Sequence, residues 1–540
     1  MHFKKALIPE YLFFTIILIF VCFVRFRFSD MAMERDEGEY AYAAAQILSK
    51  GIHEERGGFP YIDFYNMKLP GVYYFYATIF FVFGKSIQVV RLVVLILNII
   101  NCYFIKKINE KWFDERAGWL AAGVYLLAAV STRAQGLVSN CEHFVLFFFL
   151  ITLFSLTRRQ YFIAGLSAAL CMMMKQQGAI LLIFAFVYFY YELYKTRNKA
   201  TILKAFLSIS MGFAVPFISL LFFIWKNNAF SAFQFFVIDY ARAYAGLNKP
   251  TPFYFTPFTF IMSQNEWFYK EAFIAVFIAI ASIYFKKKRL FKTPYPPALL
   301  VLLALFSYLS VLPGWYYRPH YFLYVHPAMA LLVGYGFAWF YNIFKHKALK
   351  ITYILLLIAS LGTAIYEQYP VIGNYENGEF INLLYGYDYF NEMREIGQVL
   401  KLNSNPTDKI GQTANEPQLN FYADLKSASG YMYNYPFYEK QPYATRMLEQ
   451  FFSEMNTNQP RWYLKSLTDM KWKNENEHMM QDWTKTFEKA YVLRGVVYGK
   501  NEWEKTVRWN ISTIDSIPGW QPAFLIFERG DSASIKPLMR

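Results

Sequence analysis

The chain has 540 residues, of which 56% are hydrophobic and only 17% are charged. A soluble protein carries nearer a quarter charged residues, so this composition excludes an ordinary soluble protein and indicates a membrane protein. The formal net charge is +15, yet acidic residues outnumber basic ones from residue 367 on. The positive charge therefore lies in short loops between apolar segments, and not on a folded soluble face that could bind nucleic acid.

Apolar segments long enough to cross a bilayer recur through the first two-thirds of the chain. The first follows Lys4 and Lys5 and is too long for the core of a cleaved signal peptide, so we expect an uncleaved span with a cytoplasmic N-terminus. About eleven spans are expected in all. They are 11–28, 87–105, 117–131, 141–157, 161–174, 178–194, 203–225, 263–285, 296–312, 321–341 and 350–366.

Basic residues alternate along the chain with these spans. Clusters such as 106–107 and 286–289 all fall on the side of the N-terminus, which leaves the first large loop, 29–86, on the outer side. We therefore predict a polytopic α-helical protein of the plasma or inner membrane. Its transmembrane domain is 1–366, and a small α/β domain, 367–540, lies on the outer (periplasmic or extracellular) face.

The first outer loop and the C-terminal segment contain the remaining predicted elements. Residues 36–50 have apolar positions at helical spacing and are followed by Gly51, which predicts an amphipathic helix on the membrane surface. The aromatic segment 69–84 opens with Pro-Gly and is short, so we interpret it as a second interfacial helix. In the C-terminal segment we expect a helix at 388–402 and strand-like runs at 431–436 and 524–527.

Three carboxylates, Asp36, Glu37 and Glu39, lie at the start of the first predicted helix. Asp36 with Glu39 three residues later fits a capping box, and acidic residues in a first turn also favour the helix dipole. A carboxylate at the mouth of a membrane cavity is equally suited to act as a general base. The spacing leaves both interpretations open.

Lys68 lies in the segment YNMKLPG, which starts at Tyr65 and ends where the second predicted helix begins. A lysine at such a position commonly anchors the chain by reaching to the membrane surface. The alternative is a cation that contacts a lipid phosphate, helped by the N-terminus of the following helix.

Polar residues at the ends of spans form a third set. Glu142 opens one span, Lys175 separates two, and Arg318, His320 and Tyr321 precede another. Charges at membrane depth are costly and indicate function by default. A structural ion pair between Glu142 and Lys175, and a packing role for His320, are the alternatives.

The four cysteines have neither disulfide-framework nor metal-ligand spacing. They therefore indicate neither a disulfide framework nor a structural zinc site. No metal-ligand cluster with recognisable spacing is visible and no cofactor is assigned, and a carboxylate-bound divalent cation stays open.

Together these motifs resemble the GT-C superfamily of polyprenyl-phosphate-dependent glycosyltransferases, in the branch of the protein O-mannosyltransferases and lipid A aminoarabinose transferases. The resemblance covers most of residues 30–330 and is most specific in 36–91. The residues that carry it are Asp36-Glu37, Gly51, Pro60-Tyr61, the 65–71 segment, Phe83-Gly84, Arg91, Asn140-Cys141-Glu142, Lys175-Gln176-Gln177-Gly178 and Arg318 to Tyr321.

The resemblance implies an enzyme that transfers a sugar from a polyprenyl-phosphate donor to a lipid, glycan or protein acceptor on the outer membrane face. It implies that Asp36 is the catalytic base, with Glu37 in support, and that Lys68 contacts the donor phosphate. A phosphate leaves as a stable anion, so one carboxylate suffices where a glycosidase needs two, and attack from the opposite side predicts inversion. The further substrate contacts expected are Tyr65, Glu142, Lys175, Arg318, His320 and Tyr321.

Two other functions fit a protein with many spans. A polysaccharide polymerase or ligase usually has a large Arg-rich outer loop late in the chain, whereas here an acidic outer loop comes first. A transporter of lipid-linked sugars often has paired internal repeats with interrupted spans, and the sequence contains no such pairing.

Overall fold

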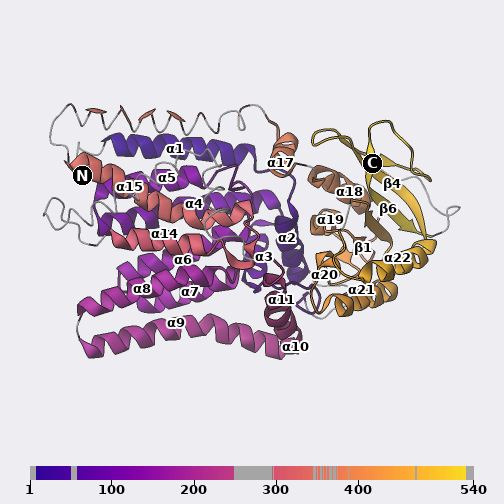
Figure 1. Cartoon of the computed structure of the whole chain (residues 1–540), viewed down its shortest axis with the longest axis horizontal. Coiled ribbons are helices and arrows are strands. Elements are labelled where there is room, and N and C mark those ends of the chain that lie inside the picture. The colour runs from indigo at the N-terminus through magenta and orange to yellow at the C-terminus, as the bar shows by residue number, and fades with distance from the viewer. Residues whose placement is uncertain are drawn as a thin grey trace. The chain divides into compact units, whose positions relative to one another are not determined.

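The computed structural model packs as two compact units, and each unit combines segments that are distant in sequence (Figure 1). The first comprises Met1–Ser29, Val90–Phe223 and Asn248–Tyr375, and the second comprises Asp30–Val89, Ile224–Leu247 and Glu376–Arg540. The residues described are 8–49, 57–196, 198–248, 295, 297–343, 375–386, 388–468 and 471–530, with scattered residues between 348 and 373.

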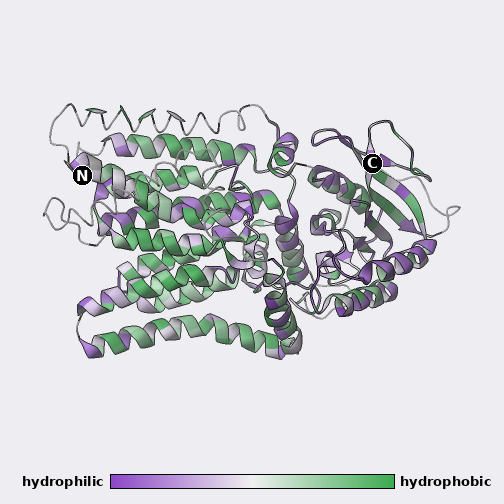
Figure 2. Cartoon of the chain, viewed as in Figure 1, coloured by the Kyte–Doolittle hydropathy of each residue, from purple (hydrophilic) through white to green (hydrophobic). Residues whose placement is uncertain are grey.

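The first unit consists of apolar helices, which are largely green in Figure 2. Five described segments have the length and hydropathy to cross a membrane: Pro9–Arg27, Ile87–Trp112, Gly178–Lys195, Lys199–Lys226 and Pro319–Trp339. The described helices of this unit are α1 (Ile8–Arg27), α4 (Ile87–Trp112), α5 (Glu115–Ala128), α6 (Cys141–Thr157), α7 (Tyr161–Met174), α8 (Gly178–Thr196), α9 (Lys199–Lys226), α14 (Ala298–Leu309), η3 (Pro313–Trp315), η4 (Pro319–Val325) and α15 (His326–Ile343).

Small residues bring two of these helices into close contact. A Cβ atom on Gly165 of α7 would clash with the carbonyl oxygen of Ile209 in α9, and a Cβ on Gly212 of α9 would clash with the carbonyl oxygen of Phe162 in α7. Such reciprocal glycine contacts are typical of helices that pack within a membrane, because they let the backbones approach closely.

The predicted spans within the described residues all fall on helices. The predicted span 263–285 lies outside the described residues, as does most of 350–366. The membrane class is therefore supported by several apolar helices, and the total of about eleven spans stays a prediction.

The second unit has a mixed sheet whose strand order is β2-β1-β3-β6-β4-β5. β1 pairs in parallel with β2 and β3, and the remaining neighbours are antiparallel. Buried Trp462 in β3 pairs with Ile410 on one side and Glu528 on the other. The strands are β1 (Lys409–Thr413), β2 (Lys426–Ser427), β3 (Trp462–Ser466), β4 (Tyr491–Gly499), β5 (Lys505–Trp509) and β6 (Gln521–Arg529).

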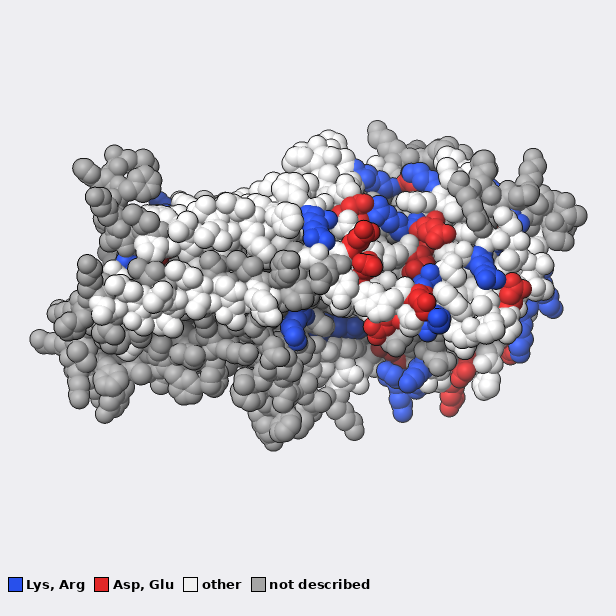
Figure 3. Space-filling model, turned by 90° about the horizontal axis from the view of Figure 1, so that it is seen from above, with Lys and Arg blue, Asp and Glu red and all other residues white. Residues whose placement is uncertain are grey.

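Helices from three parts of the chain complete the second unit. Charged side chains of both signs gather on its surface in Figure 3, whereas the described surface of the first unit in that view is almost uncharged. The helices are α2 (Arg35–Leu48), α3 (Gly71–Phe83), α10 (Phe230–Phe233), η2 (Gln234–Tyr240), α11 (Ala241–Ala245), α17 (Asn377–Tyr385), α18 (Phe390–Leu402), α19 (Pro417–Ala423), α20 (Tyr435–Tyr438), α21 (Ala444–Asn458), α22 (Asn476–Phe487) and η5 (Glu488–Ala490).

Most of the elements predicted for this unit are confirmed. The two helices of the first outer loop are α2 and α3, the helix predicted at 388–402 is α18, and residues 524–527 lie in β6. The strand-like interpretation of 431–436 is wrong, because these residues form an isolated bridge at Tyr431, bends, and the start of α20. The rings of Tyr431 and Tyr435 pack in an aromatic cluster with Tyr61 and Phe236.

The first outer loop is an integral part of the fold of the second unit. The backbone N–H of Tyr65 donates to the carbonyl of Gly430 at 2.7 Å. A Cβ atom on Gly430 would lie 2.5 Å from the Tyr65 ring. Helix α2 packs equally closely on α19, since a Cβ on Gly38 would lie 2.5 Å from Gln418 Cβ and 2.7 Å from its Cα.

The Gly38→Ala variant tests this packing. We expect it to destabilise the second unit by about 1–3 kcal/mol, because the added methyl group must displace the backbone of α19. The lowered Tm is measured by tryptophan fluorescence on the purified protein. Gly378→Ala is the matched control, since its nearest neighbour is 3.6 Å away, and its Tm should stay the same or rise. Equal effects of the two changes would contradict the close contact.

Candidate functional site

The first turn of α2 carries the carboxylates that the sequence singled out. Glu34 caps this helix, because its Oε1 accepts a hydrogen bond from the backbone N–H of Glu37 at 2.8 Å. The capping box of Asp36 with Glu39, one of the two interpretations that the sequence left open, is therefore wrong. Asp36 lies within the first turn, and 27% of its side chain is exposed. Because Glu34 forms the cap, the Asp36 carboxylate can make other contacts.

Lys68 joins two of these carboxylates. Its Nζ donates to Asp36 Oδ1 at 2.9 Å and to Glu39 Oε2 at 2.7 Å. A third bond, at 3.1 Å, reaches the Tyr40 hydroxyl, and the Tyr40 ring centroid is 4.6 Å from the ammonium. These three bonds account for the three N–H donors of a lysine ammonium. The structure thus brings together the two residues that the sequence predicted as base and phosphate contact.

Glu39 is the buried partner in this cluster. Its side chain is fully buried, and its second oxygen, Oε1, accepts from the Tyr73 hydroxyl. Burial raises the pKa of Glu39, and the neighbouring Lys68 ammonium partly offsets that rise. Burial and the Glu39 charge also raise the pKa of Tyr73 well above its usual value, so its hydroxyl stays protonated and donates.

The backbone at Lys68 is held on both sides. The Tyr61 hydroxyl donates to the Lys68 carbonyl at 2.9 Å. The Lys68 N–H donates to the Asn66 side-chain oxygen at 3.2 Å. Helix α3 then starts at Gly71. These contacts fix the direction in which the lysine side chain leaves the loop.

The C-terminal segment contributes residues that the sequence gave no reason to select. The Tyr433 hydroxyl lies 3.0 Å from the Arg35 carbonyl and 3.4 Å from Asp36 Oδ1. Burial, with the charges of Glu39 and Asp36, raises the pKa of Tyr433, so this hydroxyl also stays a donor. Tyr433 follows Asp36 by almost 400 residues, and only the fold brings the two together. Glu39, by contrast, could have been found from its position on the same helical face as Asp36.

Two other predicted residues of the second unit have clear structural contacts. Glu37 is completely buried. The Tyr65 hydroxyl donates to Glu454 Oε1 at 2.8 Å, and its ring stacks on Phe236 with centroids 4.9 Å apart. The roles predicted for Glu37 in catalysis and for Tyr65 in substrate binding stay predictions.

In the first unit, four of the predicted residues form a second cluster. Lys175 Nζ donates to the buried Glu142 Oε1 at 2.5 Å and lies 4.2 Å from the Tyr321 ring centroid. The His320 ring packs edge-on against Tyr321 at 4.9 Å, and its Nδ1 is 3.1 Å from Gln135 Oε1. The ion pair that the sequence offered as a structural alternative is therefore present.

Arg318 differs from these four residues in its exposure. Its side chain is exposed, and its guanidinium lies 5.6 Å from the Tyr316 ring centroid.

Within the described part of the chain, no group of three or more His, Cys, Asp or Glu side chains has the geometry of a metal site.

Comparisons with known proteins agree with the predicted resemblance. The model of the dolichyl-phosphate-mannose-protein mannosyltransferase family matches residues 68–225, a range that begins at Lys68 and includes Glu142 and Lys175. Asp36 lies outside that range. No curated protein matches the sequence.

Solved structures share the fold over almost the whole chain. ArnT from Cupriavidus metallidurans, in a crystal structure with bound undecaprenyl phosphate, has a TM-score of 0.56 and 14% identity over 96% of this chain and 97% of its own. The Archaeoglobus fulgidus oligosaccharyltransferase, tethered to an acceptor peptide, has a TM-score of 0.52 and 12% identity over 96% of this chain and 76% of its own. The resemblance to the GT-C superfamily predicted from the sequence is thus confirmed at the level of family model and fold.

The buried cap Glu34 should make stability depend on pH. Burial and the nearby charges of Asp36 and Glu37 raise its pKa well above the usual 4.5. A carboxyl whose pKa is raised by folding contributes to the free energy of unfolding. That contribution is fully present below the usual pKa of 4.5 and is lost as the pH rises through the pKa of the folded state. Glu34→Gln keeps a cap acceptor but cannot ionise. We expect the Tm of this variant to fall less than the wild-type Tm between about pH 5 and pH 9. Parallel plots of Tm against pH for the two proteins would contradict the raised pKa of Glu34.

Proposed function

We propose that this chain, which has the fold of ArnT and matches the model of the mannosyltransferase family over residues 68–225, is a membrane glycosyltransferase. It transfers a sugar, with inversion, from a polyprenyl-phosphate donor to a hydroxyl or phosphate of a lipid, glycan or protein acceptor. The family match and the fold support a lipid-phosphate donor. The observation that carries the proposal is the contact of Lys68 with Asp36 and Glu39.

Asp36 is the carboxylate suited to act as the base. Both oxygens of Glu39 are occupied, by Lys68 and Tyr73, and its side chain has no exposure. Asp36 retains 27% exposure, so an acceptor hydroxyl can approach it. The acceptor oxygen gives its proton to Asp36 as it attacks the anomeric carbon, and the bond from that carbon to the phosphate oxygen breaks.

Lys68 is suited to bind the departing phosphate. The phosphate takes the bonding electrons, needs no proton, and is stabilised by a fixed cation. Of the three Lys68 bonds, the one to the neutral Tyr40 hydroxyl is the weakest by type, because the other two join opposite charges. A phosphate oxygen therefore replaces Tyr40, while Glu39 continues to hold the ammonium.

For the first unit we propose contacts to the lipid carrier. Cationic and hydrogen-bonding groups come from Lys175, Arg318, His320 and Tyr321, and Glu142 balances the Lys175 charge.

The proposal places the N-terminus in the cytoplasm and the C-terminal domain on the outer face, as the distribution of basic residues predicts.

Replacing the proposed base tests the assignment directly. Asp36→Asn should reduce turnover of a polyprenyl-phosphate sugar by about 100-fold to 10,000-fold, because the amide cannot accept the acceptor's proton. Donor affinity should change little. Turnover is measured by mass spectrometry on the purified protein with a panel of donors. Asp424→Asn makes the same chemical change in an exposed ion pair with Lys85 and should leave turnover intact. Full turnover by Asp36→Asn would rule out Asp36 as the base. A transporter of lipid-linked sugars would also tolerate this change.

Replacing Lys68 should have a different kinetic signature. Lys68→Gln should raise the donor KM and lower kcat, each by about tenfold or more, because the donor phosphate loses its cation before and during bond breaking. The variant should also lose stability, since Glu39 is left buried beside a neutral group. Lys68→Gln combined with Glu39→Gln should regain stability but not turnover. Recovered turnover in that double variant would show that Lys68 has only a structural role.

A further inference from the structure

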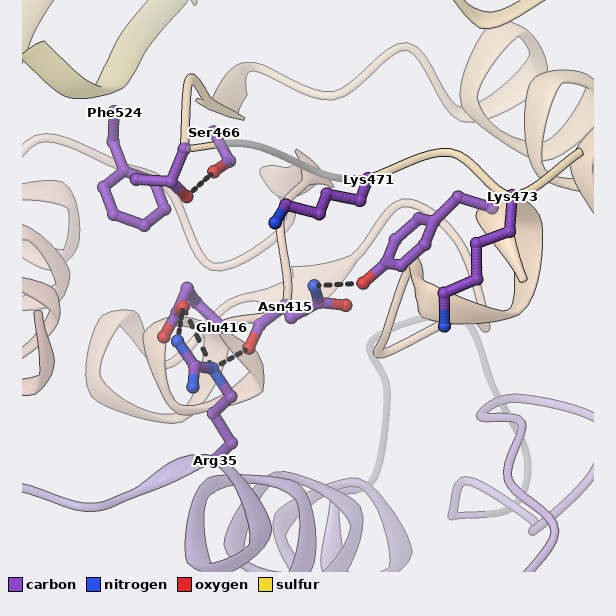
Figure 4. A pocket seen from close by; sticks show the side chains of 9 residues that line it. Arg35, Asn415, Glu416, Ser466, Lys471, Lys473 and Phe524 are labelled. Atoms are coloured by element: carbon purple, nitrogen blue, oxygen red, sulfur yellow. Dashed lines mark hydrogen bonds and ion pairs between the residues drawn. The ribbon is translucent and has the colours of Figure 1, made fainter. Parts of the chain in front are cut away.

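A cleft lies beside the start of α2, apart from the contacts of Lys68. It has a volume of about 340 Å³, and its lining includes Arg35 from α2, Glu416 just before α19, Ser466 from β3 and Phe524 from β6 (Figure 4). That volume is within the range of small-molecule sites. All of these residues belong to the second unit.

The lining of this cleft is mainly polar. The Asn415 amide group donates to the Tyr438 hydroxyl at 3.2 Å, and the Ser466 and Thr468 hydroxyls hydrogen-bond to each other at 2.8 Å. The second amide N–H of Asn415 and the remaining hydroxyl capacity are left for a ligand, and Tyr438 and Phe524 add aromatic rings. An acyl chain would leave this remaining capacity buried without partners, which is unfavourable. A sugar offers hydroxyls for the polar groups and an apolar face for a ring, so the lining fits a glycan better than a lipid tail.

The charge of the lining favours an anion. Arg35 is already paired, with Glu416 at 2.8 Å and with Asp388 at 2.7 Å. Lys471 and Lys473 also line the cleft, and both are exposed. Neither lysine takes part in an ion pair within the described residues. In Figure 4 the Lys471 side chain reaches over the space beside Asn415 and Ser466. Two lysine charges are therefore left to attract an oxyanion.

We propose that this cleft binds an acidic sugar of the acceptor, a glycan unit that carries a carboxylate or phosphate. This assignment rests on the proposed function, because it names the acceptor of the same enzyme. Lys471 and Lys473 bind the oxyanion, and Asn415 and Ser466 bind sugar hydroxyls. Arg35 directly precedes Asp36, so a sugar in the cleft lies beside the turn that carries the proposed base.

The test measures the binding of acidic and neutral sugars to the full-length protein in nanodiscs of neutral lipid. The probes are glucuronic acid, glucose 6-phosphate and glucose. Wild type should bind the two acidic probes more tightly than glucose. The double variant Lys471→Gln with Lys473→Gln should bind the acidic probes about tenfold or more weakly, because charged hydrogen bonds are lost. The matched control is Lys485→Gln with Lys489→Gln, which removes two exposed lysines away from the cleft and should change nothing.

Three outcomes would overturn the proposal. The first is equal binding of glucose and the acidic probes, and the second is equal binding of the acidic probes by both lysine double variants. The third is an effect of the Lys471 and Lys473 changes that appears only in nanodiscs with phosphatidylglycerol, since the anion would then be a lipid headgroup.

Donor turnover separates this proposal from the proposed function. In the absence of acceptor, the variant at Lys471 and Lys473 should hydrolyse donor within about twofold of wild type, because the cleft lysines do not contact the Asp36 cluster. With an acidic acceptor its KM should rise while kcat is kept. A wild-type protein that turns over no donor would reject the proposed function, whereas loss of the acidic preference alone would reject the assignment of the cleft.

Discussion

The buried ion pair between Lys68 and Glu39 is the constraint on which the site depends. Removing an ammonium and a carboxylate from water is costly, and the structure offsets that cost only by satisfying their hydrogen bonds. The three Lys68 donors reach Asp36, Glu39 and Tyr40, and Tyr73 satisfies the other Glu39 oxygen. The cluster is therefore rigid, and Asp36 is the member that stays accessible. A fixed cation beside an accessible base needs little rearrangement during sugar transfer.

Arg35 and Asp36 are consecutive residues with different partners. The Arg35 guanidinium bonds to Asp388 and Glu416 in the C-terminal segment, whereas the Asp36 carboxylate bonds to Lys68 in the first loop. The first turn of α2 thus ties the polar cleft to the candidate base within one rigid element. Any movement of the C-terminal segment that disturbed Arg35 would also displace Asp36. We regard this coupling as the reason that the loop and the C-terminal segment fold as one unit.

The sequence predicted the helices well because hydrophobic periodicity and Pro-Gly signals are local. It also singled out Asp36 and Lys68, through a motif and not through their contact, and their catalytic roles stay predictions. Contacts between distant segments could not be predicted from the sequence. Tyr433 contacts Asp36 only because of the fold, and Tyr431 and Tyr435 pack in an aromatic cluster instead of forming a strand. The sequence left open whether Asp36 is a cap or a catalyst, because Glu34 and Asp36 are both plausible cap acceptors and only the backbone geometry distinguishes them.

The contact between Tyr65 and Gly430 has a consequence for synthesis of the protein. The loop 30–89 leaves the ribosome long before 376–540, the segment that completes its core. At about 5–20 residues per second, this delay lasts on the order of tens of seconds. During that interval the aromatic faces of the loop lack their final partners. We therefore expect these faces to be shielded by the membrane surface or a chaperone until the last strands emerge.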